Sequence, residues 1–157
     1  MKITALFFGV FAGCLSCIPA HAADYLWNGG NGSWTDSGAW RLDDSSADWS
    51  NGNTAQFQTD SSITVGSGIS ASGMLYNGAA ITLNGGSLTL TGAAAGNNGG
   101  SATLSNTGLI LDAPNAEDSY EVRDTSLTGS ATLAKTGAGT VTLDGAHTAS
   151  GVWNINA

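Results

Sequence analysis

Short apolar–polar–apolar segments recur through residues 61–157 at a spacing of 20 or 21 residues. Segments that begin at positions 81 and 102, 88 and 109, and 120 and 141 lie 21 residues apart, and positions 133 and 153 lie 20 apart. Period-two alternation is typical of half-buried strands. A repeat of about 20 residues that holds two or three very short strands has the length that one coil of a parallel β-helix needs. The sequence therefore predicts an all-β fold, a right-handed parallel β-helix (solenoid).

Glycine and asparagine separate these segments, because both residues adopt the positive φ angles at which a chain turns a corner. Antiparallel hairpins around two-residue turns would show no longer period. A β-sandwich or an irregular all-β domain stays open as the alternative. The strand segments are Ile63-Thr64-Val65, Ile81-Thr82-Leu83, Leu88-Thr89-Leu90, Ala102-Thr103-Leu104, Leu109-Ile110-Leu111, Tyr120-Glu121-Val122 and Val141-Thr142-Leu143.

Residues 112–119, with Pro114 and Glu117-Asp118, interrupt the alternation and predict a loop that protrudes from one coil. The inward positions of the coils are expected to stack Leu, Ile and Val on one another. Thr, Ser and Asn are expected to face outward or to form ladders.

The first 22 residues predict a secretory signal peptide. Lys2 precedes an apolar run over residues 3–18, Pro19 ends that run, and Ala20-His21-Ala22 offers small residues for cleavage after Ala22. A transmembrane helix and a lipoprotein signal lipidated at Cys14 are the alternatives. No transmembrane segment is expected after the signal, and we expect an exported protein. Both cysteines lie in the signal, so the mature chain is expected to fold without disulfides.

The charge balance excludes a nucleic-acid-binding role. The formal net charge is −8, and removal of the signal leaves Arg41, Arg123 and Lys135 as the basic residues against 12 acidic ones. Three bases cannot form the basic face that nucleic acid requires. The same scarcity argues against attraction to an anionic membrane surface.

Residues 23–60 differ in composition and contain four of the five tryptophans, namely Trp27, Trp34, Trp40 and Trp49. The end of a β-helix exposes unpaired strand edges and core side chains, which invites aggregation. We therefore expect this segment to be a Trp-rich N-terminal cap. The alternative is an aromatic platform for sugar, in which Trp34 and Trp40 would face the ligand.

Residues 133–157 resemble the autotransporter-associated β-strand repeat, also called the passenger-associated transport repeat. The sequence departs from the family pattern at His147, Ala149 and Trp153, where Asn, Tyr and Thr are usual. The N-terminal segment resembles what precedes such repeats, through Trp27-Asn28-Gly29, Trp34, Trp40 and Ala55-Gln56-Phe57. The residues that match the repeat pattern are Leu133, Lys135, Gly137, Gly139, Thr140, Val141, Leu143, Gly145, Ser150, Gly151 and Ile155.

This resemblance implies one β-helix coil over 133–157, within 61–157, in the N-terminal portion of an autotransporter passenger. Family members end in a membrane β-barrel translocator, which these 157 residues do not contain. The expectation is therefore a fragment, a truncated product or a member without its barrel. The resemblance places the protein in the medium or at the cell surface and outer membrane, or in the periplasm if the translocator is absent.

The sequence predicts no catalytic, cofactor or metal site. His147 is the one histidine after the signal, and no serine has a Gly-x-Ser-x-Gly context. Gly29-Gly30-Asn31-Gly32 is similar to the start of a calcium-binding repeat, but Trp34 occupies the Asp position. Two acidic clusters are expected to be solvated surface; they are Asp43-Asp44 with Asp48, and Glu117-Asp118 with Glu121 and Asp124.

The function expected from these observations is an exported structural or adhesive surface module, without catalysis of its own. Its partner would be a glycan or protein on a host or cell surface. A carbohydrate-binding or carbohydrate-active β-helix protein is the alternative, because parallel β-helices also host polysaccharide lyases and hydrolases that use clustered carboxylates.

Overall fold

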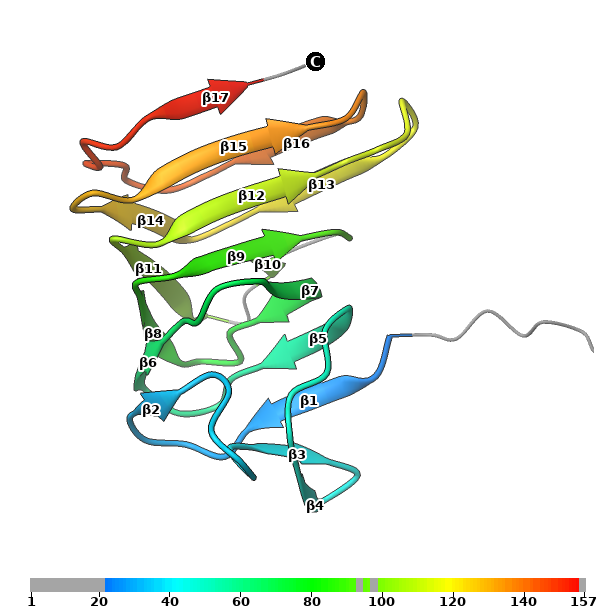
Figure 1. Cartoon of the computed structure of the whole chain (residues 1–157), viewed down its shortest axis with the longest axis vertical. Helices are drawn as coiled ribbons and strands as arrows, with labels where there is room; N and C mark the ends of the chain where they lie inside the picture. Colours follow the sequence, from blue (N-terminus) through cyan, green and yellow to red (C-terminus); the bar gives the residue numbers. More distant parts are fainter. Residues whose placement is uncertain (1–21, 93–94, 97–98, 156–157) are drawn as a thin grey trace, which may run out of the picture.

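The computed structural model describes residues 22–92, 95–96 and 99–155 and shows an all-β solenoid of about five turns (Figure 1). No helix occurs among these residues. The predicted signal, residues 1–22, lies outside the described part apart from its last residue. Strands from successive turns stack along the long axis, from β1 near the bottom of Figure 1 to β17 at the top.

Two hydrogen-bonded sheets form the walls of the solenoid. The long sheet follows the order β17-β15-β12-β9-β7-β5-β1-β3-β4, and β10, β13 and β16 form a branch from β7. The short sheet follows the order β14-β11-β8-β6-β2. The short-sheet strands are β2 (Gly32–Ser33), β6 (Ser61–Thr64), β8 (Ala80–Asn84), β11 (Ser101–Ser105) and β14 (Thr125–Thr128). The long-sheet strands are β1 (Asp24–Trp27), β3 (Trp40–Leu42), β4 (Ser45–Ala47), β5 (Asn53–Gln56), β7 (Ile69–Leu75), β9 (Ser87–Leu90), β10 (Ala95–Gly96), β12 (Gly108–Asp112), β13 (Ser119–Val122), β15 (Thr132–Thr136), β16 (Thr140–Leu143) and β17 (Trp153–Ile155).

The predicted repeat is confirmed by the strand register. Ile81 pairs with Ala102, Leu88 with Leu109, Tyr120 with Val141 and Leu133 with Trp153, all between parallel strands. These are the pairs that the 20- and 21-residue spacing predicts. A sandwich of antiparallel hairpins is therefore excluded for this part of the chain.

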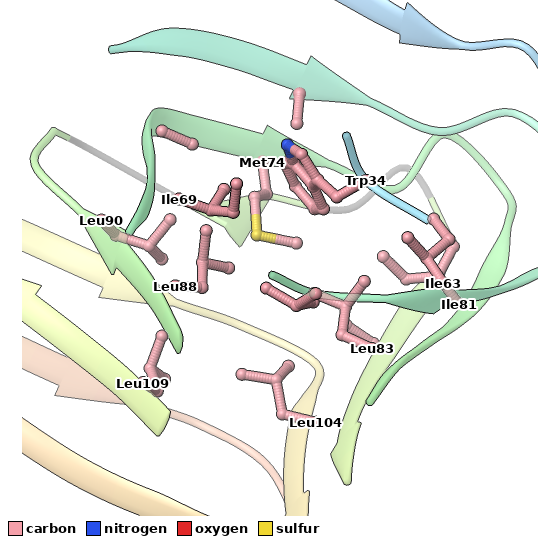
Figure 2. Packing of buried hydrophobic residues seen from close by; sticks show 14 of the residues in the cluster. Trp34, Ile63, Ile69, Met74, Ile81, Leu83, Leu88, Leu90, Leu104 and Leu109 are labelled. Carbon is pink, nitrogen blue, oxygen red and sulfur yellow. The ribbon is translucent and has the colours of Figure 1, made fainter. Parts of the chain in front are cut away.

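Aliphatic side chains stack in columns along the inside of the solenoid. In the short sheet, Leu83 lies over Leu104, and Leu104 lies over Leu127; each is at most 1% exposed. Figure 2 shows Ile63, Leu83 and Leu104 projecting into the same interior. Full burial of a leucine side chain contributes about 1.5–3 kcal/mol. Each turn therefore adds a similar apolar layer to one continuous core.

The corners between strands explain why glycine and asparagine punctuate the repeat. Gly86 has φ +60, and a Cβ there would collide with the carbonyl oxygen of Val65 in the preceding turn. Asn106 has φ 56, and its Oδ1 accepts hydrogen bonds from Ser130 N (2.9 Å) and Ser130 Oγ (3.0 Å) in the next turn. These corners both bend the chain and join adjacent turns.

The interruption predicted at residues 112–119 is a connection over residues 113–118 between β12 and β13, and Asp112 and Ser119 belong to the strands. The following turn covers it, because Gly139 N donates to Ala113 O (2.9 Å) and Thr140 N donates to Asp118 O (2.8 Å). The extra residues lengthen the repeat, so that Leu109 pairs with Leu133, 24 positions later. The next turn thus follows the path of the longer connection and pairs with it.

Tyr76 is the main buried polar side chain of the core. Its hydroxyl lies 3.2 Å from Thr125 Oγ1, and Thr125 Oγ1 also lies within hydrogen-bond distance of Arg123 O (3.1 Å). Because the threonine has a single hydroxyl proton, which Arg123 O accepts, Tyr76 is the donor toward Thr125. Burial raises the pKa of Tyr76 far above its usual value; the hydrogen bond with Thr125 lowers it in part, and Asp124 raises it further.

We predict that Leu104→Ala lowers the free energy of unfolding by about 2–5 kcal/mol, because it leaves a cavity in a fully packed layer. Thr103→Ala, on the outward side of the same strand, is the matched control and should cost less than about 1 kcal/mol. Urea unfolding followed by far-UV circular dichroism measures both. Equal losses in the two variants would contradict the inward stacking of Leu104.

We also predict that stability falls as the pH rises above about 10, the ordinary tyrosine pKa. Above that pH the unfolded chain releases the Tyr76 proton while the folded chain keeps it, so the slope approaches a loss of about 1.4 kcal/mol per pH unit for this group. Urea midpoints between pH 8 and 11 test this, since Tyr76→Phe should flatten the slope. A slope that is the same in both proteins would refute the assignment.

Candidate functional site

The tryptophans of the N-terminal segment form one aromatic cluster inside the first turns. Trp34 follows β2, Trp40 begins β3, and their ring centroids lie 4.9 Å apart. Trp40 also contacts Trp27 at 5.1 Å and Trp49 at 4.7 Å. Tilted and edge-to-face contacts of this kind add about 0.5–1.5 kcal/mol per pair beyond the area that they bury. The cluster is therefore a second, aromatic core at one end of the aliphatic one.

A hairpin of β3 and β4 holds this cluster in place. β3 pairs antiparallel with β1, with Trp27 opposite Trp40, whereas the other neighbour of β1, β5, runs parallel to it. The indole Nε1 of Trp40 donates to the carbonyl oxygen of Trp34 at 2.8 Å. The hairpin thus satisfies the outer edge of β1, which would otherwise be a free template for another strand.

Trp34 and Trp40 are both 0% exposed, so neither side chain can face a ligand. A sugar-binding platform at these two residues would need exposed rings, and the structure buries both of them. Figure 2 shows Trp34 among the buried hydrophobic side chains of the core. The geometry corresponds to the predicted cap, and the platform alternative fails at these two residues.

Two outward rows of side chains run along the short sheet. The first row pairs Ser62 with Thr82, Thr82 with Thr103 and Thr103 with Ser126. The second row consists of Ser33, Thr64, Asn84, Ser105 and Thr128, each paired with its neighbour. All of these side chains are exposed or half-buried and none is charged. This hydroxyl face, as we call the two rows, carries regularly spaced hydrogen-bonding groups on a rigid support.

The first acidic cluster has structural partners. Asp48 Oδ1 accepts hydrogen bonds from Gly38 N (2.8 Å) and Ser37 Oγ (3.0 Å). Asp44 forms an exposed ion pair with Arg41 at 3.1 Å in the β3–β4 turn. Exposed pairs of this kind contribute little to stability. The hydrogen bonds and the ion pair of this cluster are thus contacts within and beside the β3–β4 hairpin.

The second acidic cluster is spread along the chain between β12 and β14. Asp118 Oδ2 accepts a hydrogen bond from Asn115 N at 2.8 Å and so closes the loop. Glu121 and Arg123 form an exposed ion pair at 2.6 Å, and the hydrogen bond from Arg123 lowers the pKa of Glu121. No group of three His, Cys, Asp or Glu residues that could hold a metal ion occurs in the described ranges.

His147 lies between β16 and β17, where its ring packs edge-on against Trp153 at 5.6 Å. Both imidazole nitrogens are shielded from solvent and have no hydrogen-bond partner among the residues described. In the described part of the chain, the imidazole therefore lacks the hydrogen bonds to a serine hydroxyl and a carboxylate that a catalytic triad requires.

A groove of about 490 Å³ lies between β15, β16 and β17, a site that the sequence analysis did not anticipate. Leu111, Leu133, Val141 and Leu143 form most of its apolar lining, and Lys135 is the charged residue in it. The available signal was the alternation Leu133-x-Lys135, which places Lys135 at an inward position. From the sequence, Lys135 is identified only as a basic residue and as part of the repeat motif.

Comparisons with models of protein families, with curated proteins and with solved structures found no match to this chain. Within the described ranges, no helix is long and apolar enough to cross a membrane.

We predict that Trp40→Ala lowers the free energy of unfolding by about 3–5 kcal/mol, through the cavity and the lost hydrogen bond. Trp40→Phe keeps most of the packing and should lose less. Far-UV circular dichroism and urea unfolding give the stability, and a glycan array gives binding for both variants and for Trp34→Ala. Loss of glycan binding with unchanged folding would instead assign these side chains to a ligand.

Proposed function

We propose that the chain is an exported structural and adhesive surface module, a passenger segment of the autotransporter type, without catalysis of its own. The observation that carries the proposal is the hydroxyl face on a solenoid whose turns are locked by parallel pairing. Such a face offers the same hydrogen-bonding groups once per turn, which suits contact with an extended partner surface.

The rigidity of the hydroxyl face supports an adhesive role. The pairings of β6 with β8, β8 with β11 and β11 with β14 contain no register shift. Buried Leu83, Leu104 and Leu127 lie directly behind the outward residues, so the outward side chains have a fixed support. A partner that binds this face therefore has little backbone entropy to remove, which favours binding by small polar side chains.

The last turns support the passenger assignment. The segment that resembles the transport repeat forms β15, the corner at Gly137 and Gly139, and β16, followed by β17. The two glycines approach the backbone of residues 113–118 so closely that a Cβ at either position would collide with it. The close packing of one coil on the previous one thus explains why the motif has glycine at these two positions.

The mode of folding also suits export. The stacked coils hold together through backbone pairing and apolar layers, and each coil contacts mainly its neighbours. A chain of this kind can pass through a membrane unfolded and then assemble coil by coil outside the cell. No cofactor or bond-forming partner enters this proposal.

We predict that the purified chain binds extracellular-matrix proteins or cell-surface glycans on an array, and that the double variant Thr82→Lys/Thr103→Lys weakens binding at least about tenfold, or about 1.4 kcal/mol. Thr89→Lys, on the outward side of β9 in the other sheet, is the matched control and should bind normally. Absence of binding to every arrayed partner, or equal loss in both variants, would contradict the adhesive role. Mass spectrometry of the exported chain, expected to begin at Ala23, tests the export step separately.

A further inference from the structure

A lysine stands in the apolar interior of the solenoid at one position. In the parallel register, Leu90 pairs with Leu111 and Leu111 pairs with Lys135, so the lysine continues an inward column of leucines. Lys135 is 8% exposed. Lysine is almost never this deeply buried without a partner of opposite charge. The position therefore requires an explanation beyond surface solvation.

The ammonium group of Lys135 keeps unused hydrogen-bonding capacity. Its Nζ donates to the carbonyl oxygen of Gly137 at the corner between β15 and β16. An ammonium has three protons to donate, and no carboxylate within ion-pair distance of Lys135 is found in the described part of the chain. Removal of an unpaired charge from water is costly. A negatively charged group near Nζ would offset that cost.

The groove beside this ammonium has the size and lining of a small-molecule site. Its volume of about 490 Å³ falls within the range of about 300–1,000 Å³ that is typical of ligand pockets. β15 and β17 form one wall through Leu133 and Trp153, and β16 forms the other through Val141 and Leu143. The lining of the groove is therefore apolar, apart from the ammonium group of Lys135.

Two lining side chains of the groove are exposed. Trp153 and Ile155 line it and are 43% and 62% exposed, so apolar surface is left in water. An apolar molecule in the groove would cover this surface, while Lys135 is the charged residue that it would meet there.

We propose that this groove binds a carboxylate with an unbranched apolar tail. The carboxylate accepts hydrogen bonds from Lys135 Nζ, and the tail lies along Leu111, Leu133, Leu143 and Trp153. Charge complementarity favours a carboxylate, because a neutral or cationic apolar molecule would fill the groove and leave the ammonium group of Lys135 without an anionic partner. The inference goes beyond the proposed adhesive role and does not depend on it, since the hydroxyl face belongs to the other sheet.

The net charge of −8 opposes anion binding at long range. The apolar tail must therefore supply most of the affinity, and the carboxylate the selectivity. A charge-assisted hydrogen bond contributes about 1.5–3 kcal/mol. This predicts a preference of roughly ten- to a hundredfold for the acid over the alcohol of equal chain length.

Isothermal titration calorimetry of the full chain with decanoate, decanol and decylammonium tests the proposal. Decanoate should bind saturably and at least about tenfold more tightly than decanol, decylammonium should bind most weakly, and Trp153 fluorescence should shift to the blue. Equal affinities for the acid and the alcohol, or no saturable binding of decanoate, would overturn the proposal. This comparison uses the unmodified chain, so it does not depend on whether any variant folds.

Lys135→Met keeps the length of the side chain and removes its charge. It should lower decanoate affinity at least about tenfold and leave decanol affinity unchanged, whereas Arg41→Met, on the β3–β4 hairpin, should change neither. Unchanged decanoate binding in Lys135→Met would refute the role of the ammonium. Sedimentation velocity without ligand tests whether the chain forms a dimer. If two copies close the groove on each other, the occupant of the groove is a second copy and the proposal fails.

Discussion

The parallel pairing of each turn with the next is the constraint on which the structure depends. Because pairing fixes the register, it also decides that Leu83 lies over Leu104 and Leu104 over Leu127. The register of the strands thus determines both the backbone hydrogen bonds and the apolar layers of the core. A slip of one residue would turn every inward side chain outward, so the two kinds of interaction stabilise the same arrangement.

The same constraint governs which residues are available at the surface. In the short sheet, every second residue points into the core, and most of the others form the hydroxyl face. The corners are equally restricted, since Gly86 and Gly139 leave no room for a side chain beside the previous turn. Function in such a molecule is left to outward rows, to the loops and to the ends of the stack. The proposed adhesive surface and the proposed carboxylate groove occupy two of these places.

The sequence predicted the turns well because most of them repeat at a spacing close to 20 residues. The pairs Leu88–Leu109 and Tyr120–Val141 follow from counting residues. The sequence predicted a Trp-rich cap, in agreement with the burial of Trp34 and Trp40. It left the platform open as an alternative, since an aromatic-rich segment without a period does not show which rings are exposed. Lys135 was missed for a different reason: its inward position was visible, but its chemistry suggested the surface. The groove arises between three consecutive strands, β15, β16 and β17, and the alternation that predicts each strand does not encode the space left between them.

The antiparallel pairing of β3 with β1 makes the two ends of the stack unequal. A strand that runs parallel to β1 cannot join on that side, because β3 already uses the backbone groups there. The long sheet therefore extends by parallel coils from β1 only away from the tryptophan cluster, where each coil pairs with the one before it. Successive coils lie only about 20 residues apart, so every closure step costs a similar and modest entropy. The hairpin thus closes one edge of the long sheet and marks the end from which the coils stack. Assembly from this end proceeds in the N- to C-terminal direction.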